Sequence, residues 1–152
     1  MPRTIYLVGC GKNKRPTTSK IRDLYTGSLF QKALAYAEAS AEKVSRDGHV
    51  QPYILVLSAF LGVIGLDRIS QPYDLSMGDL SKRERADWGR RVAKRLQRDH
   101  RVDPERDRLV VLAGKAYAEP LRAHFARVEE PMTGLGYGQR LRWLNEHKPE
   151  DR

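Results

Sequence analysis

Short apolar runs alternate along the chain with longer stretches in which apolar residues recur every three or four positions. Runs of β-forming residues predict three buried strands and a short fourth one, at residues 5–8, 52–57, 109–113 and 126–129. The three- and four-residue spacing predicts helices at residues 28–46, 82–99, 114–125 and 137–147. Strand and helix therefore alternate from one end of the chain to the other.

This alternation predicts an α/β fold with three layers, α/β/α, and a mainly parallel central sheet of about four strands. No internal repeat or linker is visible, so we expect residues 1–152 to form one domain. In a parallel sheet, the loops that follow the strands lie at one edge. Those loops are residues 9–22, 58–79, 113–117 and 130–138. The segment 58–79 is long for a connection, and such loops are commonly functional.

The composition adds an excess of positive charge to this picture. The formal net charge is +9 at pH 7, so nucleic acid is the first partner to expect, ahead of an anionic membrane surface or an acidic protein. Basic proteins that bind no nucleic acid are also common. The single cysteine excludes an intrachain disulfide. The absence of a signal peptide and of an apolar stretch near ~18 residues predicts a cytoplasmic protein without a membrane span.

The loop after the first strand reads Gly9-Cys10-Gly11-Lys12-Asn13-Lys14. It fails the Walker A pattern, because no Gly-Lys-Ser/Thr follows at the required spacing, and it lacks the third glycine of the dinucleotide fingerprint. ATP hydrolysis and NAD binding are therefore not expected, and no cofactor is predicted. Its amides and lysines still suit phosphate or carboxylate oxygens, although a solvated basic loop is the simpler alternative.

Cys10 is a candidate nucleophile, because lysines and backbone amides stabilise a thiolate. No histidine lies near it in the sequence, so a small residue packed at the end of a strand is the favoured interpretation. The cysteine and the four histidines do not have the spacing of metal ligands, and no metal site is predicted.

Two segments combine a carboxylate with a tyrosine, namely Asp23-Leu24-Tyr25 and Gln71-Pro72-Tyr73-Asp74-Leu75. A carboxylate can orient water and stabilise the positive charge that develops on a sugar carbon when a glycosidic bond breaks. A tyrosine ring offers a surface on which a base can stack. Capping and turn roles are the alternative for both aspartates.

Two glycine-containing segments begin helices, Gly114-Lys115 and Gly134-Leu135-Gly136-Tyr137-Gly138-Gln139. Unpaired amides in a first helical turn favour a phosphate, but a plain helix start is the alternative. The helix at residues 82–99 carries eight Lys or Arg and three Asp or Glu, a balance of +5. Its outer face suits contact with a nucleic-acid backbone and is equally typical of a solvated surface. Its expected buried stripe is Ala86, Val92, Ala93 and Leu96.

Several short motifs occur in one order: Cys10-x-x-x-Lys14, Asp23-Leu24-Tyr25-x-x-x-Leu29-Phe30, Leu57-Ser58-Ala59-x-x-Gly62, Pro72-Tyr73-Asp74, Gly114-x-x-Tyr117 and Gly134-x-Gly136-x-Gly138. As an ordered set they resemble a family of small bacterial and phage proteins related to the uracil-DNA-glycosylase-like superfamily, and anti-phage DNA glycosylases that remove hypermodified bases. The resemblance implies a three-layer α/β/α fold and cleavage of an N-glycosidic bond. Two departures stand out. Phe60 and Leu61 replace the family's lysine and aromatic residue, and the water-activating and histidine motifs of uracil-DNA glycosylase are absent.

The leading hypothesis is a DNA N-glycosylase that excises a modified base in phage defence, without a metal or cofactor. Asp74 or Asp23 would position water and stabilise charge, Asn13 would read or polarise the base, and Tyr25 or Tyr73 would stack on it. Further substrate-binding residues are expected in the strand-end loops: Cys10, Lys12, Lys14, Ser58, Lys115, Tyr117, Gly134, Gly136 and Gly138. The alternatives are a non-enzymatic binder of nucleic acid or nucleotides and a hydrolase of free nucleotides or nucleosides. The identity of the base, the choice between DNA and RNA, and the oligomeric state stay open.

Overall fold

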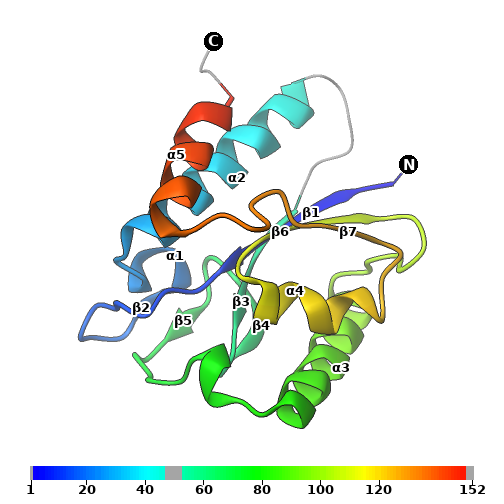
Figure 1. Ribbon diagram of the computed structural model, residues 1–152, viewed down its shortest axis with the longest axis horizontal. Coiled ribbons are helices and arrows are strands. Elements are labelled where there is room, and N and C mark those ends of the chain that lie inside the picture. The colour runs from blue at the N-terminus through cyan, green and yellow to red at the C-terminus, as the bar shows by residue number, and fades with distance from the viewer. Residues whose placement is uncertain (1, 47–52, 150–152) are drawn as a thin grey trace.

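The computed structural model describes residues 2–46 and 53–149. Its centre is a five-stranded sheet of order β4-β3-β1-β6-β7 (Figure 1). In chain order the strands are β1 Thr4–Gly9, β3 Tyr53–Ser58, β4 Gly62–Gly65, β6 Arg108–Leu112 and β7 Arg127–Glu129. All neighbouring pairs are parallel except β3 and β4, which are antiparallel. The predicted mainly parallel sheet is confirmed, with one strand more than the sequence indicated.

The additional strand, β4, lies inside the segment 58–79 that was predicted to be a long loop. The chain reverses directly after β3, and Gly62 has a φ of 80°, a conformation that favours glycine. Further along the segment, β5 (Ile69–Ser70) pairs with β2 (Ser19–Lys20) from the loop after β1. Two loops that are distant in sequence are thereby joined at the edge of the main sheet.

Helices cover both faces of the sheet, which confirms the three-layer α/β/α architecture (Figure 1). α2 (Ser28–Arg46) and α5 (Tyr137–His147) pack together on one face. α3 (Lys82–Asp99) and α4 (Lys115–Arg122) pack together on the other. Two shorter elements, α1 (Ile21–Leu24) and the 3-10 helix η1 (Met77–Asp79), lie in the loops.

Successive residues of the central strands point to opposite faces, so each strand contributes to two cores. Ile5 and Leu7 of β1 belong to the core that α3 and α4 cover, where Trp88 is the largest fully buried side chain. Tyr6 and Val8 belong to the core that α2 and α5 cover. Because both faces of the sheet are covered, the strands are apolar on both sides.

Gly89 allows α3 and α4 to approach closely. A Cβ atom at this position would lie 2.6 Å from the Cβ of Pro120. The predicted buried stripe of this helix is wrong at one position, since Ala86 is exposed. Trp88 and Gly89 are buried instead, and Gly89 lies at the contact between α3 and α4.

Other element boundaries differ from the predictions by a few residues. β3 begins at Tyr53, and Pro52 lies outside the described residues. α4 ends at Arg122, so His124 and Phe125 follow the helix rather than belonging to it. Asp23 lies in the one-turn helix α1 and not in an open loop.

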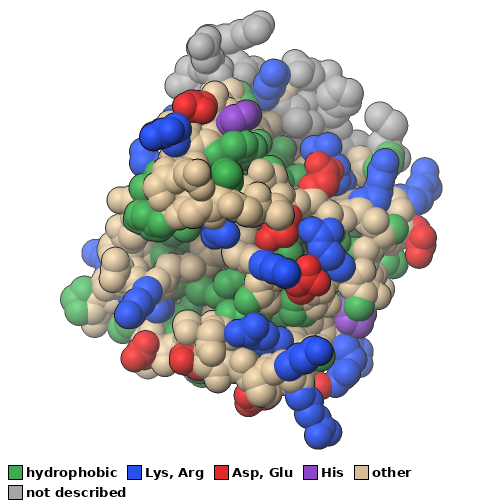
Figure 2. Space-filling model, in the orientation of Figure 1, with side chains coloured by type: hydrophobic (Ala, Val, Ile, Leu, Met, Phe, Trp, Pro, Cys, Tyr) green, Lys and Arg blue, Asp and Glu red, His purple; other side chains and the backbone are tan. Residues whose placement is uncertain are grey.

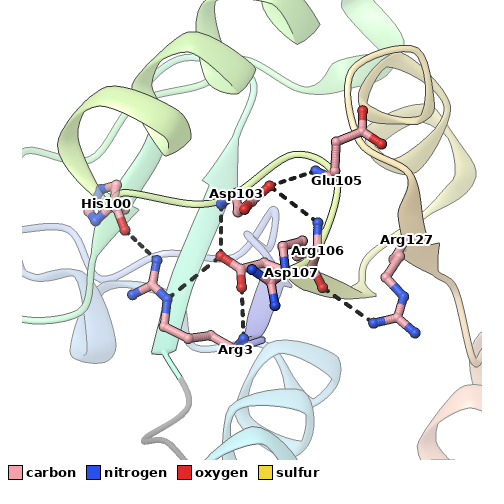
Figure 3. A network of polar contacts seen from close by, with 7 residues as sticks. All are labelled: Arg3, His100, Asp103, Glu105, Arg106, Asp107 and Arg127. Carbon is pink, nitrogen blue, oxygen red and sulfur yellow. Dashed lines mark hydrogen bonds and ion pairs between the residues drawn. The ribbon is translucent and has the colours of Figure 1, made fainter. Parts of the chain in front are cut away.

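The amino ends of β1 and β6 are joined by Asp107, which is buried (Figure 3). Its carboxylate accepts hydrogen bonds from the backbone N–H groups of Arg3 and Asp103, each at 2.7 Å. The Arg3 guanidinium lies 3.7 Å from the same carboxylate and donates to the carbonyl of His100. The acidic segment before β6 is therefore structural, and it lies at the sheet edge opposite the strand-end loops.

Candidate functional site

The loop after β1 is fixed by backbone hydrogen bonds to two other segments, the end of β3 and the residues that follow α1. The Cys10 N–H donates to the carbonyl of Leu57 at the end of β3, at 2.9 Å. The Asn13 carbonyl accepts from the N–H of Thr26, also at 2.9 Å, and Lys14 forms a bridge with Tyr25. The loop is thus held against the end of the sheet and against α1, which gives Lys12 and Lys14 defined positions.

A network of hydroxyl groups joins Tyr25, which follows α1, and the end of β3 to the segment before η1. The Tyr73 hydroxyl lies 2.5 Å from the Tyr25 hydroxyl and 2.6 Å from the Ser58 hydroxyl. The Ser58 oxygen also accepts from the N–H groups of Phe60 and Leu61, so it stabilises the reversal between β3 and β4. Tyr73 is the centre of the network, and the residue after it is Asp74.

Three tyrosines of the site keep neutral hydroxyl groups at physiological pH. Burial raises the pKa of Tyr25 to about 12. Burial is also the main cause that raises the pKa of Tyr73 and of Tyr117 above the ordinary tyrosine value. The Lys14 ammonium lies 4.6 Å from the centre of the Tyr73 ring, a cation–π contact. These hydroxyl groups can donate and accept hydrogen bonds, but they do not act as bases.

A cavity of about 370 Å³, which we name the polar cavity, opens beside this network. Its lining comes from the loop after β1, the segment before α3 and the first turns of α4: Cys10, Gly11, Lys12, Lys14, Asp74, Leu75, Ser76, Asp79 and Tyr117. The Asp79 carboxylate is engaged by the N–H and hydroxyl of Ser76, which lower its pKa. Asp74 has no such partner within the described part of the chain, so it is the carboxylate of this cavity that remains available to a ligand.

A second cavity of about 220 Å³, the apolar cavity, adjoins the first. The two share Cys10, Gly11 and Tyr117, and the Cys10 sulfur lies 3.4 Å from the Tyr117 hydroxyl. The other lining residues are mostly apolar or glycine: Gly9, Leu29, Phe30, Ala33, Leu112, Ala113, Gly114, Met132 and Arg140. We refer to the two cavities together as the cleft.

Five of the predicted site residues line the cleft, namely Cys10, Lys12, Lys14, Asp74 and Tyr117. Two others, Ser58 and Tyr73, hold its wall through the hydroxyl network. The convergence follows from strand polarity, because β1, β3 and β6 are parallel and end at the same edge.

Several other predicted residues lie outside the cleft. Asp23, Asn13 and Lys115 are exposed, and none of them lines either cavity. The same is true of the three glycines before and within the start of α5: Gly134, Gly136 and Gly138. The amide of Gly136 donates to the Gln139 side chain at 2.9 Å, so this amide already has a hydrogen-bond partner.

The predicted stacking role of Tyr25 is also wrong, because its side chain is 0% exposed. Its ring packs against Phe30 with ring centres 4.9 Å apart, and no face of it is open to a base. The exposed ring is that of Phe60, which is 61% exposed and lies 5.1 Å from Tyr73. The only sequence signal for Phe60 was its departure from the family pattern. Arg140 also lines the apolar cavity, and its position beside the last glycine-rich loop was the sequence signal for it.

A basic groove of about 700 Å³ lies along α3 and the end of α4. It is lined by Arg90, Arg91, Ala93, Lys94, Gln97, Arg98 and His124. Lys and Arg side chains gather over these helices at the lower right of Figure 2. Arg90 and Arg98 form ion pairs with Asp87 and Asp99, whereas Arg91 and Lys94 form none among the described residues. The helix still carries an excess of positive charge, with eight Lys or Arg against three Asp or Glu.

A family model described as a family of unknown function, DUF6884, matches residues 5–146. The chain belongs to this family. The DUF6884 match includes every residue that lines the cleft and the basic groove. No curated protein and no solved structure matches the chain.

Two further properties bear on what this DUF6884 protein can bind. Among the described residues, no three His, Cys, Asp or Glu side chains are grouped so that they could hold a metal ion. Across the described ranges, no helix combines the length and the apolar character that crossing a bilayer requires.

Proposed function

We propose that this protein is a DNA N-glycosylase that excises a modified base by hydrolysis of the N-glycosidic bond. The observation that carries the proposal is the polar cavity, in which Asp74 shares one space with Lys12 and Lys14. Lysines suit the phosphates that flank a nucleotide, and a carboxylate suits a sugar carbon that becomes positively charged. The resemblance of the ordered motifs to glycosylases supports the same chemistry.

In this proposal Asp74 is the catalytic carboxylate and Asp23 is not, because Asp23 does not line the cleft. Asp74 holds a water beside C1′ of the deoxyribose and stabilises the positive charge there as the bond to the base breaks. The electron pair of that bond leaves with the base nitrogen, which takes up a proton. The water oxygen bonds to C1′ and loses its proton, which yields a free base and an abasic site.

The aromatic and basic surfaces around the cleft suit the remainder of such a substrate. A nucleotide must leave the stack to reach a cavity of this kind, at a cost that contacts with the protein offset. Phe60 offers an exposed ring beside Tyr73 for a neighbouring base. The basic groove on α3 offers cations for the phosphates of the flanking duplex.

The test is an incubation of the purified protein with unmodified DNA, DNA with modified bases, and phage genomic DNA. Abasic sites are detected by cleavage in alkali, and released bases by mass spectrometry. We expect base release from at least one modified DNA. Asp74→Asn should abolish release while Asp23→Asn, a matched change on an exposed aspartate outside the cleft, should retain it. Absence of base release across the panel would overturn the proposal.

Retained DNA affinity without base release would instead favour a non-enzymatic binder. Release from free nucleotides alone, with weak dependence on salt, would favour a nucleotide or nucleoside hydrolase.

A further inference from the structure

The apolar cavity has a composition that differs from that of its neighbour. Apolar side chains and glycine backbone form most of its lining, and Arg140 is its one Lys or Arg side chain. An apolar space of this kind binds a flat ring, and a single guanidinium in it selects rings with hydrogen-bond acceptors at the edge.

The geometry of Arg140 leaves its outer nitrogens available. Its Nε donates to the carbonyl of Leu135 at 3.0 Å, which anchors the guanidinium group. Among the described residues, no hydrogen bond or ion pair engages its Nη1 and Nη2 atoms. Nη1 lies 3.9 Å from the position that a Cβ on Gly114 would occupy, at the inner wall of the cavity. An anchored guanidinium with open Nη groups is suited to a carbonyl oxygen of a ligand.

Two glycines keep this space open. A Cβ on Gly11 would extend toward Phe30, at 3.8 Å from its Cβ, and a Cβ on Gly114 would extend toward Arg140. Both distances are ordinary van der Waals contacts, and neither glycine has a positive φ. Alanine is therefore compatible with the backbone at both positions. Its effect would be to fill part of the cavity rather than to strain the fold.

We infer that the apolar cavity binds the base itself, and that Arg140 selects bases that carry a keto oxygen over adenine, which has none. This inference rests on the proposed function, since it assigns the base to the apolar cavity and the sugar-phosphate to the polar cavity. Cys10, Gly11 and Tyr117, which line both cavities, are then the boundary at which the glycosidic bond lies. Arg140 donates from its Nη groups to the keto oxygen, as arginine does to guanine O6.

The single cysteine provides a direct readout, because Cys10 lines the cavity and is the only thiol in the chain. The rate of alkylation by iodoacetamide is measured for the native protein with increasing concentrations of uracil, thymine, cytosine or adenine. We expect uracil, thymine and cytosine, each of which carries a keto oxygen, to slow the alkylation at concentrations about tenfold lower than adenine requires, the discrimination typical of arginine contacts to a base.

Three variants locate the effect. Arg140→Lys, which keeps the charge and loses the planar donor fork, should remove the preference for keto bases. Gly11→Ala should reduce protection by every base, because it fills part of the cavity. Gly27→Ala is the matched control, since nothing lies within 4 Å of a Cβ at that position, and it should leave protection unchanged. Thermal unfolding confirms that each variant is folded.

Equal protection by adenine and uracil, or an unchanged preference in Arg140→Lys, would overturn the inference. The assay contains no DNA and breaks no glycosidic bond, so its result is separate from that of the glycosylase test. Protection by keto bases without any base release would retain the site and reject the proposed reaction. Base release without such protection would retain the reaction and reject the site.

Discussion

The Tyr73 hydroxyl lies 2.6 Å from the Ser58 hydroxyl, so the segment that carries Asp74 is tied to the end of β3. The two residues are fifteen positions apart, and β4 lies between them. This contact sets the position of the proposed catalytic carboxylate relative to the sheet.

Tyr73→Phe should destabilise the protein by about 2 kcal/mol, because it removes the hydrogen-bond partner of the buried Tyr25 hydroxyl and one of the partners of the buried Ser58 hydroxyl. The free energy of unfolding from urea titration measures this. Tyr137→Phe is the control, since Tyr137 is 60% exposed and its hydroxyl is solvated. Equal stability of Tyr73→Phe and the unmodified protein would show that the hydroxyl network does not hold the site.

Stability should fall as the pH rises above about 10. Tyr25 has a folded-state pKa of about 12, above its ordinary value of 10.0, so the unfolded chain loses this proton first. The contribution of Tyr25 is therefore complete below pH 10 and is lost as the pH rises through 12. The raised pKa values of Tyr73 and Tyr117 act in the same direction. Urea titrations from pH 8 to 12 measure how the free energy of unfolding falls with pH, and this fall should be shallower in Tyr25→Phe. A slope that this substitution leaves unchanged would contradict the assignment.

Alanine substitutions at two helical glycines should have opposite effects. Gly89→Ala should cost about 1–3 kcal/mol, because the new Cβ would lie 2.6 Å from the Cβ of Pro120 and 2.8 Å from its carbonyl oxygen. Gly138→Ala should stabilise α5 by up to about 1 kcal/mol, since nothing lies within 4 Å and alanine favours a helix. Thermal unfolding of both variants and of the unmodified protein measures these effects. If Gly89→Ala melted at the same temperature as the unmodified protein, the close approach of α3 and α4 would be refuted.

The basic groove should contribute to DNA affinity through phosphate contacts. Replacement of Arg91 and Lys94 by glutamine should make the plot of log affinity against log salt concentration less steep. The magnitude of its negative slope should fall by about 2, one for each lost phosphate contact. Fluorescence anisotropy with a labelled duplex measures it at several salt concentrations. The control replaces Lys43 and Lys148 by glutamine, which removes the same amount of charge. Both lysines are exposed and lie on the layer formed by α2 and α5, away from the basic groove. Equal slopes in both double variants would exclude a specific role for the groove.

The sequence predicted the convergence of the strand-end loops because it depends only on strand polarity. Parallel strands bring their carboxyl ends to one edge, which placed Cys10, Lys14 and Tyr117 together without knowledge of strand order. The class of fold was readable for the same reason, since apolar strands and amphipathic helices alternate in the chain.

The choice between Asp74 and Asp23 could not be predicted, because both follow the same pattern of a carboxylate near a tyrosine. It depends on the fold of residues 58–79, where β4 is too short and too rich in glycine to be recognised. Tyr25 was expected to stack on a base, yet its ring is fully buried against Phe30. The hydrogen bond from the Gly136 amide to the Gln139 side chain could have been predicted from the sequence, because a glutamine three residues after the start of a helix is a known capping signature.

The most direct test of the central claim is a single-turnover measurement of base excision by Asp74→Asn, with DNA affinity measured in parallel. We predict a rate at least about 100-fold below that of the unmodified protein, the usual contribution of a positioned general base. DNA affinity should be retained or increased, because the substitution removes a negative charge from the cleft. Asp23→Asn should excise at the unmodified rate. Equal excision rates in the two variants, or loss of excision in Asp23→Asn alone, would contradict the account.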